Sequence, residues 1–113
     1  MNYKMNLHCR PYQRIDSGLK VVEMRLNTPE RKKIKVGDTI EFTNRDTNEV
    51  LKVEVINLKS FPTFKELYEA YPKEKLGYLK DEEANYRDMN EYYSDIDITS
   101  NGVLAIEIRK TST

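Results

Sequence analysis

The residues best suited to chemistry lie close together in the segment Gly18-Leu19-Lys20-Val21-Val22-Glu23-Met24-Arg25. Apolar residues alternate with charged ones along residues 20–26, which is typical of a β-strand. Side chains two positions apart on a strand point to the same side, so Glu23 and Arg25 share a face. By the same alternation Lys20 points away from them, unless a bulge or the turn at Gly18 redirects it.

Three roles are open to this group of charges. They can form an ion-pair ladder on the surface. In a cleft, Lys20 can lose solvation and act as a nucleophile or base, with Glu23 exchanging protons. In the same cleft, Lys20 and Arg25 can bind phosphate while Glu23 accepts a hydrogen bond from a base edge. Lys20 and Glu23 are therefore our candidate catalytic residues, and Arg25 is a candidate binding residue.

Four further residues are candidates for binding, namely His8, Arg10, Tyr92 and Tyr93. His8 lies on the polar side of the first strand and is followed by Arg10, and His8 reaches the same cleft if this strand pairs with the strand that holds Glu23. Aromatic rings beside basic groups can stack nucleobases, with a gain of ~1–3 kcal/mol per base. The alternative is that His8 makes ordinary hydrogen bonds, Tyr93 packs in the core and Tyr92 lies at the surface.

Several classes of site have no support in the sequence. The four glycines are isolated, so there is no glycine-rich phosphate loop. A single histidine without a carboxylate at ligand spacing predicts no metal site, and we expect no cofactor. Cys9 falls on the apolar side of an expected strand, where a free cysteine serves as a small hydrophobic residue.

The composition predicts one domain spanning residues 1–113, of which 38% are hydrophobic and 34% charged. The absence of a long apolar run or a signal-peptide pattern, together with the single cysteine, predicts a cytoplasmic protein with no membrane partner. Residues 1–36 carry six more basic than acidic side chains, and the rest carries the opposite excess. This asymmetry predicts either a basic face for an anionic partner or a surface on which the charges are mixed. The basic run 31–35 can hold a nucleic-acid backbone or be a solvated turn.

The pattern of apolar residues and turn formers predicts an α+β fold: a small, mostly antiparallel β-barrel with peripheral helices. Closure of the barrel would leave no exposed strand edge. We expect strands at residues 3–9, 20–26, 39–43, 50–58 and 103–109, with a hairpin turn at 44–49. We expect helices at 11–17, 64–71 (opened by a capping box at Thr63) and 81–93, a helical turn at 29–33, a connector at 73–79 and a loop at 95–102.

The sequence resembles the ASCH domain family of the PUA-like superfamily from about Leu7 to Arg109. The resemblance rests on an ordered set of motifs: Gly18-x-Lys20-x-x-Glu23-x-Arg25, Ile34-Lys35-x-Gly37-Asp38-x-Ile40-x-Phe42, Ser60-Phe61 before Phe64-x-x-Leu67, Met89-x-x-Tyr92-Tyr93-Ser94, and Gly102-Val103-Leu104-Ala105-Ile106. It implies a PUA-like β-barrel with a cleft beside the Gly-x-Lys strand. It also implies a link to RNA or nucleosides, since related PUA domains bind RNA.

The resemblance leads to two functions for the same cleft. The first is an RNA- or nucleotide-binding module. The second is an amidohydrolase or ribonuclease, since some relatives hydrolyse N4-acetylcytidine-type nucleosides with a lysine, a threonine and a glutamate. Lys20 matches that lysine, Glu23 stands in place of the threonine, and Glu82 and Glu83 lie in the region of the glutamate. A third hypothesis is a protein-interaction module, which predicts an exposed apolar patch. The sequence predicts no particular oligomeric state.

Overall fold

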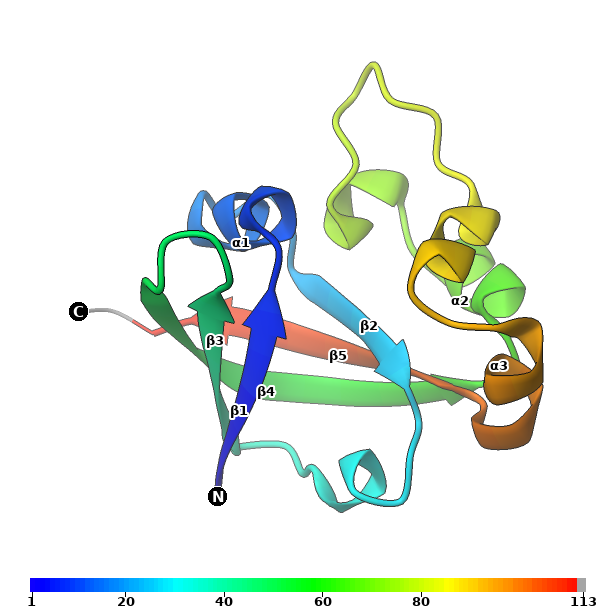
Figure 1. Cartoon of the computed structure of the whole chain (residues 1–113), viewed down its shortest axis with the longest axis horizontal. Coiled ribbons are helices and arrows are strands. Elements are labelled where there is room, and N and C mark those ends of the chain that lie inside the picture. Colours follow the sequence, from blue (N-terminus) through cyan, green and yellow to red (C-terminus); the bar gives the residue numbers. More distant parts are fainter. Residues whose placement is uncertain (112–113) are drawn as a thin grey trace.

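The computed structural model describes residues 1–111. Five strands form one mixed sheet, with short helical segments between them (Figure 1). The strands are β1 (Asn2–Leu7), β2 (Val22–Leu26), β3 (Thr39–Asn44), β4 (Val50–Phe61) and β5 (Val103–Lys110). The α-helices are α1 (Cys9–Asp16), α2 (Phe64–Ala70) and α3 (Asp95–Asn101), and the 3-10 helices are η1 (Arg31–Lys33), η2 (Lys73–Leu76) and η3 (Tyr86–Glu91).

The sheet has the strand order β1-β3-β4-β5-β2 and curves into a half-barrel. The β1–β3 pair is parallel and the other three pairs are antiparallel, so the prediction of a mostly antiparallel α+β fold is confirmed. The prediction of a closed barrel is wrong, because β1 and β2 are the two edge strands and do not pair with each other. A side chain spans the gap between these strands, since Arg25 Nη2 on β2 donates to the carbonyl oxygen of Asn6 on β1.

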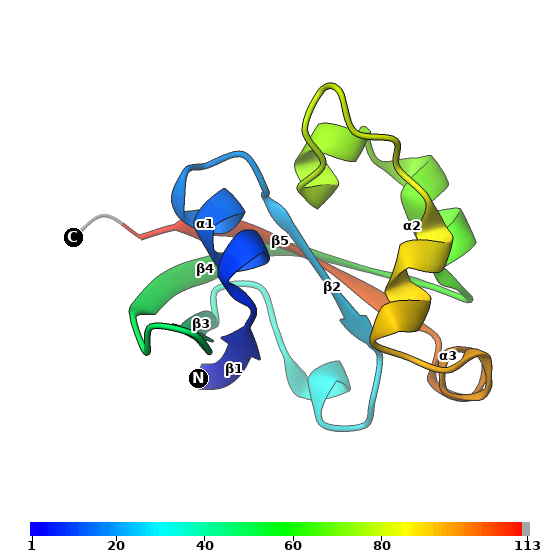
Figure 2. The same cartoon turned by 45° about the horizontal axis from the view of Figure 1, so that its top comes forward.

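Both faces of the sheet are covered. One face packs against α1, where Tyr12 and Ile15 are buried with Phe42 and Ile106. The other face packs against α2, η2, η3 and α3, whose buried residues cluster with those of β2 and β5. Figure 2 shows α1 toward one end of the long β4–β5 pair and α2 and α3 toward the other end. Residues of β2 and β5 are therefore buried on both faces.

Local signals placed several elements correctly. Thr63 caps α2 with the predicted capping box, in which Glu66 accepts from the Thr63 N–H at 3.1 Å. The β3–β4 hairpin turns over residues 45–49, and a 3-10 helix covers part of 29–33. Gly18, with φ of +87°, ends α1 in the left-handed region that favours glycine.

Two of the predicted elements are wrong. Residues 81–93 do not form an α-helix, because the side chain of Glu82 binds Arg14 and the Leu79 N–H, and a 3-10 helix begins only after Asn85. Residues 95–101 are helical rather than a loop, since Ser94 accepts a hydrogen bond from the Asp97 N–H. Ser94 and the acidic residues that follow it are ordinary helix start signals, and Gly102 is an ordinary stop signal. This helix could therefore have been predicted.

The position predicted for Cys9 is also wrong. The first strand ends at Leu7, and Cys9 begins α1 with a partly exposed side chain. The Cys9 N–H donates to Asp46 Oδ2 at 3.2 Å, a contact from the β3–β4 turn that sequence alone does not reveal.

The helices are short. The longest α-helix, α1, has eight residues, and a helix that crosses a bilayer needs about 20. Within residues 1–111 we find no helix that is long and apolar enough to span a membrane.

Candidate functional site

Lys20, Glu23 and Arg25 form one buried ionic cluster, which we call the triad. The Lys20 ammonium lies 2.9 Å from Glu23 Oε1, and Arg25 Nη2 lies 2.9 Å from Glu23 Oε2. Arg25 Nε also donates to Glu23 Oε2 at 3.0 Å. Glu23 is only 2% exposed and Lys20 only 8%. The three charges therefore converge, as the sequence pattern suggested they could.

The turn after α1 brings Lys20 to the same side as Glu23. Lys20 precedes β2, and its N–H donates to the carbonyl oxygen of Arg14 at 2.9 Å. Because Lys20 lies in this turn, strand alternation does not govern its side chain, and its ammonium reaches Glu23. The glycine turn at Gly18 is thus the device that redirects Lys20.

The electrostatics of the triad favour a permanent carboxylate. Burial by itself raises the pKa of Glu23, but the charges and hydrogen bonds of Lys20 and Arg25 outweigh it and lower the pKa to about 2. The Met24 N–H adds a further hydrogen bond to Glu23 Oε1 at 3.2 Å. Burial lowers the pKa of Arg25, but the neighbouring Glu23 carboxylate more than compensates and leaves it raised. The triad therefore combines one ionised carboxylate with two basic side chains.

A pocket of about 190 Å³, the triad pocket, lies between the triad and the open side of the half-barrel. Arg25 crosses this side, and its Nη2 donates to the carbonyl oxygen of Asn6 on β1 at 3.0 Å. The pocket is lined by Asn6, Leu7, His8, Pro11, Lys20, Glu23, Met24, Arg25, Arg45, Met89, Tyr92 and Tyr93. Basic, aromatic and apolar groups thus surround one buried carboxylate.

The two adjacent tyrosines lie differently. The Tyr92 side chain is 51% exposed, and its ring centroid is 6.1 Å from that of His8. Tyr93 is stacked against buried Phe64 at 6.0 Å and packs against the core. Tyr92 is therefore the ring available to a ligand, whereas Tyr93 forms part of the pocket wall.

Six of the seven predicted site residues line the triad pocket, and Arg10 does not. Arg10 lines an adjoining pocket of about 390 Å³, the loop pocket, together with Arg14 and Glu82. Sequence reasoning missed Asn6 and Arg45. Arg45 lies in the β3–β4 turn, where its N–H donates to the Leu7 carbonyl at 2.8 Å, a long-range contact without a sequence signal.

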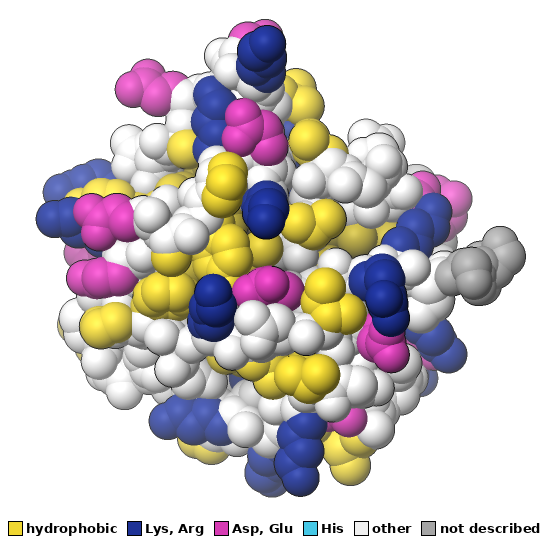
Figure 3. Space-filling view, turned by 180° about the vertical axis from the view of Figure 1, so that it is seen from behind, with side chains coloured by type: hydrophobic (Ala, Val, Ile, Leu, Met, Phe, Trp, Pro, Cys, Tyr) yellow, Lys and Arg dark blue, Asp and Glu magenta, His cyan; other side chains and the backbone are white. Residues whose placement is uncertain are grey.

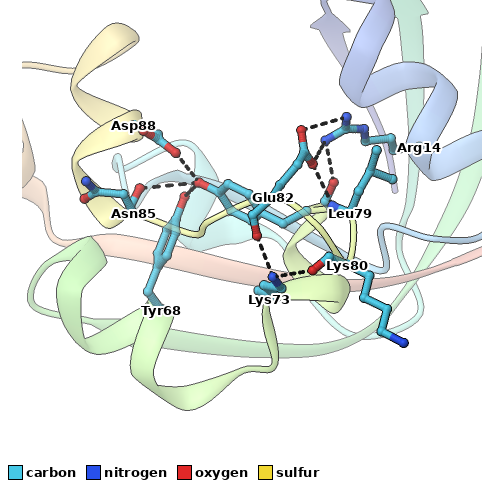
Figure 4. Close-up of polar contacts among 10 residues, drawn as sticks. Arg14, Tyr68, Lys73, Leu79, Lys80, Glu82, Asn85 and Asp88 are labelled. Carbon is cyan, nitrogen blue, oxygen red and sulfur yellow. Dashed lines mark hydrogen bonds and ion pairs between the residues drawn. The ribbon is translucent and has the colours of Figure 1, made fainter.

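Glu82 and Glu83 lie outside the triad pocket and line the loop pocket instead. The Glu82 carboxylate pairs with Arg14 through two contacts, at 2.9 and 3.2 Å (Figure 4). Glu23 is therefore the one carboxylate among the described residues that line the triad pocket.

The loop pocket also contains a hydrogen-bonded tyrosine pair. Tyr78 donates to Asp88 at 2.7 Å and lies 2.9 Å from the hydroxyl of Tyr68. Burial raises the pKa of Tyr68 to about 12. These tyrosines are neutral hydrogen-bonding groups near neutral pH. Across residues 1–111, no cluster of three or more histidine, cysteine, aspartate or glutamate side chains is arranged to hold a metal ion.

A half-barrel with a cleft at the Gly-x-Lys strand defines a PUA-like fold, and the family model for the ASCH domain matches residues 5–112. The chain belongs to the ASCH domain family. A comparison with curated proteins finds no sequence relative.

Solved structures share the fold. The crystal structure of hypothetical protein PH0355 is 29% identical, with a TM-score of 0.85 over 98% of this chain and 100% of that one. The solution structure of protein PF0455 from Pyrococcus furiosus is 27% identical, with a TM-score of 0.71 over the whole of both chains. ASCH from Zymomonas mobilis is 18% identical, with a TM-score of 0.66 over 94% of this chain and 65% of that one, and shows the fold alone.

Proposed function

We propose that the triad pocket binds a nucleotide or an RNA segment through an oxygen-rich group such as a phosphate. The observation that carries the proposal is the excess positive charge of the buried triad. Glu23 has a pKa of about 2 and stays ionised, but a single carboxylate carries one negative charge and contacts two basic side chains. A buried excess charge attracts an anion more strongly than an exposed one, since water screens it less.

The aromatic and basic groups at the mouth of the pocket support the same ligand class. Tyr92 offers an exposed ring beside the triad, and a nucleobase can stack on it. Exposed Arg45 lines the same pocket and supplies a second cation for a phosphate. The proposed ligand therefore combines a planar ring with an anionic group, as a nucleotide does.

The properties of Glu23 favour binding over catalysis. A general base works best when its pKa lies near the working pH. A carboxylate with a pKa of about 2 that already accepts hydrogen bonds from Lys20, Arg25 and the Met24 N–H is a weak base. The amidohydrolase and ribonuclease alternatives assign the proton exchange beside Lys20 to a carboxylate, and Glu82 is engaged with Arg14.

A protein-interaction surface has less support. Figure 3 shows hydrophobic side chains gathered on the face turned away in Figure 1, but lysine, arginine and acidic side chains interrupt them. The most exposed hydrophobic residues within the described chain, apart from Met1, are Ile96, Val36 and Val50, and they come from different elements. These features are not those of one continuous apolar docking patch.

The test is a titration of labelled single-stranded RNA and of nucleoside monophosphates at two salt concentrations. We expect binding that weakens with salt and falls about tenfold in Arg45→Ala, which removes one charged contact. Arg87→Ala is the matched control, because Arg87 is equally exposed but does not line the triad pocket. Absence of binding to RNA and nucleotides, or equal losses in both variants, would overturn the proposal. Cleavage of the RNA, or of an acetylated nucleoside, would favour the enzyme instead.

A further inference from the structure

The backbone at Gly77 lies directly against the aliphatic stem of Lys20. A Cβ atom added to Gly77 would come within 2.9 Å of Lys20 Cδ, 3.2 Å of its Cγ and 3.3 Å of its Cβ. Real Cβ atoms do not approach other atoms as closely as the first of these distances. Lys20 is 8% exposed and lines both the triad pocket and the loop pocket, so the Gly77 backbone bounds one side of a stem that lies between these two spaces.

Arg14 holds this backbone in place. Its Nη1 donates to the carbonyl oxygen of Gly77 at 2.8 Å and to Glu82 Oε1 at 2.9 Å, and its Nη2 donates to Glu82 Oε2 at 3.2 Å. The carbonyl oxygen of Arg14 also accepts from the Lys20 N–H. One residue of α1 thus contacts the backbone of Lys20 and the segment that presses on its side chain.

The segment 77–82 is braced at its far end as well. The Leu79 N–H donates to Glu82 Oε1 at 2.6 Å, and the Lys73 ammonium donates to the carbonyl oxygens of Lys80 and Glu82 (Figure 4). The Val21 N–H donates to the Lys75 carbonyl at 3.0 Å, which ties η2 to the start of β2. The segment 77–82 forms the wall beside Lys20. It is held by Arg14 of α1 on one side and by Lys73 on the other.

We propose that Gly77, Arg14 and Glu82 are positioning residues that hold the Lys20 ammonium in the triad pocket. The Glu23 carboxylate fixes only the end of the lysine side chain, whose four rotatable bonds leave several routes to that point. The backbone at Gly77 closes one side of the stem and so removes the routes that pass through that side. Any side chain at position 77 displaces the stem and draws the ammonium away from Glu23. This inference rests on the proposed function, because it gives the wall a part in binding.

The experiment compares Gly77→Ala with Gly37→Ala. The two glycines have similar positive φ angles, +103° and +95°, so both variants place an alanine in the same strained backbone conformation. A Cβ at Gly37 meets nothing within 4 Å, whereas a Cβ at Gly77 meets Lys20. The difference between the variants therefore isolates the contact with Lys20 from the cost of the backbone.

The first readout is the pKa of Glu23 in the absence of ligand, measured by carbon-detected NMR of its side-chain carboxyl group. We expect it to rise above its value of about 2 in Gly77→Ala and to stay unchanged in Gly37→Ala. A merely structural defect at position 77 would lower stability without moving this pKa. The second readout is affinity for the RNA and nucleotide probes, with a loss of about tenfold in Gly77→Ala relative to Gly37→Ala. An unchanged pKa of Glu23 in a folded Gly77→Ala protein overturns the inference.

A second pair of variants serves if Gly77→Ala does not fold. Arg14→Gln removes the contacts with Gly77 and Glu82, and Lys110→Gln removes another ion pair of α1, that between Lys110 and Asp16. We expect the pKa of Glu23 to rise only in Arg14→Gln, and equal values in the two variants would contradict the inference. If the pKa responds as expected while the wild-type protein binds no probe, the proposed function fails and the positioning role stands.

Discussion

Arg25 on β2 donates from Nη2 to the main-chain carbonyl oxygen of Asn6 on β1, at 3.0 Å. These strands are the two edges of the half-barrel, and no backbone pairing joins them. The same guanidinium holds the Glu23 carboxylate from the other side. One side chain therefore bridges the open side of the sheet and shapes the proposed site, so we expect changes to the triad to alter both stability and the proposed binding.

Replacing the buried carboxylate should destabilise the fold. In Glu23→Gln, Lys20 and Arg25 lose the anion that compensates their burial, and we expect the free energy of unfolding to fall by about 3 kcal/mol. Urea denaturation measures the change. Glu41→Gln is the control, because its partner Lys52 is 3.8 Å away and half exposed, and a pair of this kind contributes ~0–1 kcal/mol. Equal effects of the two substitutions would contradict the importance of the buried triad.

The same group predicts an acid-labile fold. Glu23 has a pKa of about 2 in the folded protein and an ordinary value of 4.5, so the unfolded chain binds its proton first as the pH falls. The resulting stabilisation is complete above about pH 4.5 and is lost between pH 4.5 and 2, with a total of about 3 kcal/mol.

The measurement is urea denaturation of the wild type and Glu23→Gln across this pH range. Other acids elsewhere in the chain, such as Asp38 and Glu82, also have lowered pKa values, and they act in the same direction in both proteins. The wild-type advantage should shrink as the pH approaches 2. A constant difference across the range would show that Glu23 is not the titrating group.

Tyr92 should contribute to ligand affinity and little to folding. Its ring is half exposed, so Tyr92→Ala should change the free energy of unfolding by less than about 0.5 kcal/mol. Affinity for single-stranded RNA should fall by about 1–3 kcal/mol, the range for loss of one stacked base. Tyr92→Phe keeps the ring and should bind as the wild type does. A Phe variant as weak as the Ala variant would assign the effect to the hydroxyl group rather than to stacking.

The capping box of α2 allows a test of a contribution to the free energy of unfolding that depends only on neighbouring residues. Thr63 accepts from the Lys65 N–H at 3.2 Å and completes a capping box with Glu66. Thr63→Ala should lower the free energy of unfolding by about 1 kcal/mol, measured by thermal or urea denaturation. Thr63→Ser keeps the hydroxyl group and should lose much less. The triad pocket does not include Thr63, so RNA affinity should be the same in both variants.

The outcome of the predictions separates local signals from contacts between distant segments. The cap at Thr63 and the left-handed Gly18 could be predicted because each depends on a few neighbouring residues. The helix expected over residues 81–93 failed because Glu82 binds Arg14, a partner 68 residues away. The helix at 95–101 was missed although Ser94 and Gly102 mark its ends, so that error was avoidable.

The candidate site likewise combines features that the local sequence predicts with features that depend on contacts between distant segments. The spacing of Glu23 and Arg25 places them on one face of a strand, because strand geometry has a period of two residues. Whether that face meets water or a pocket depends on where β1 lies relative to β2, and Arg45 enters only through the β3–β4 turn.

The β2 strand, its charged face, the glycine turn before it and the ASCH motifs can all be recognised in the amino-acid sequence. The open side of the barrel, the close approach of Gly77 to Lys20 and the exposure of Tyr92 rather than Tyr93 emerge from the folded chain. The physical reason is that local conformation follows from neighbouring residues, whereas burial and charge pairing depend on segments that meet only after the chain has folded.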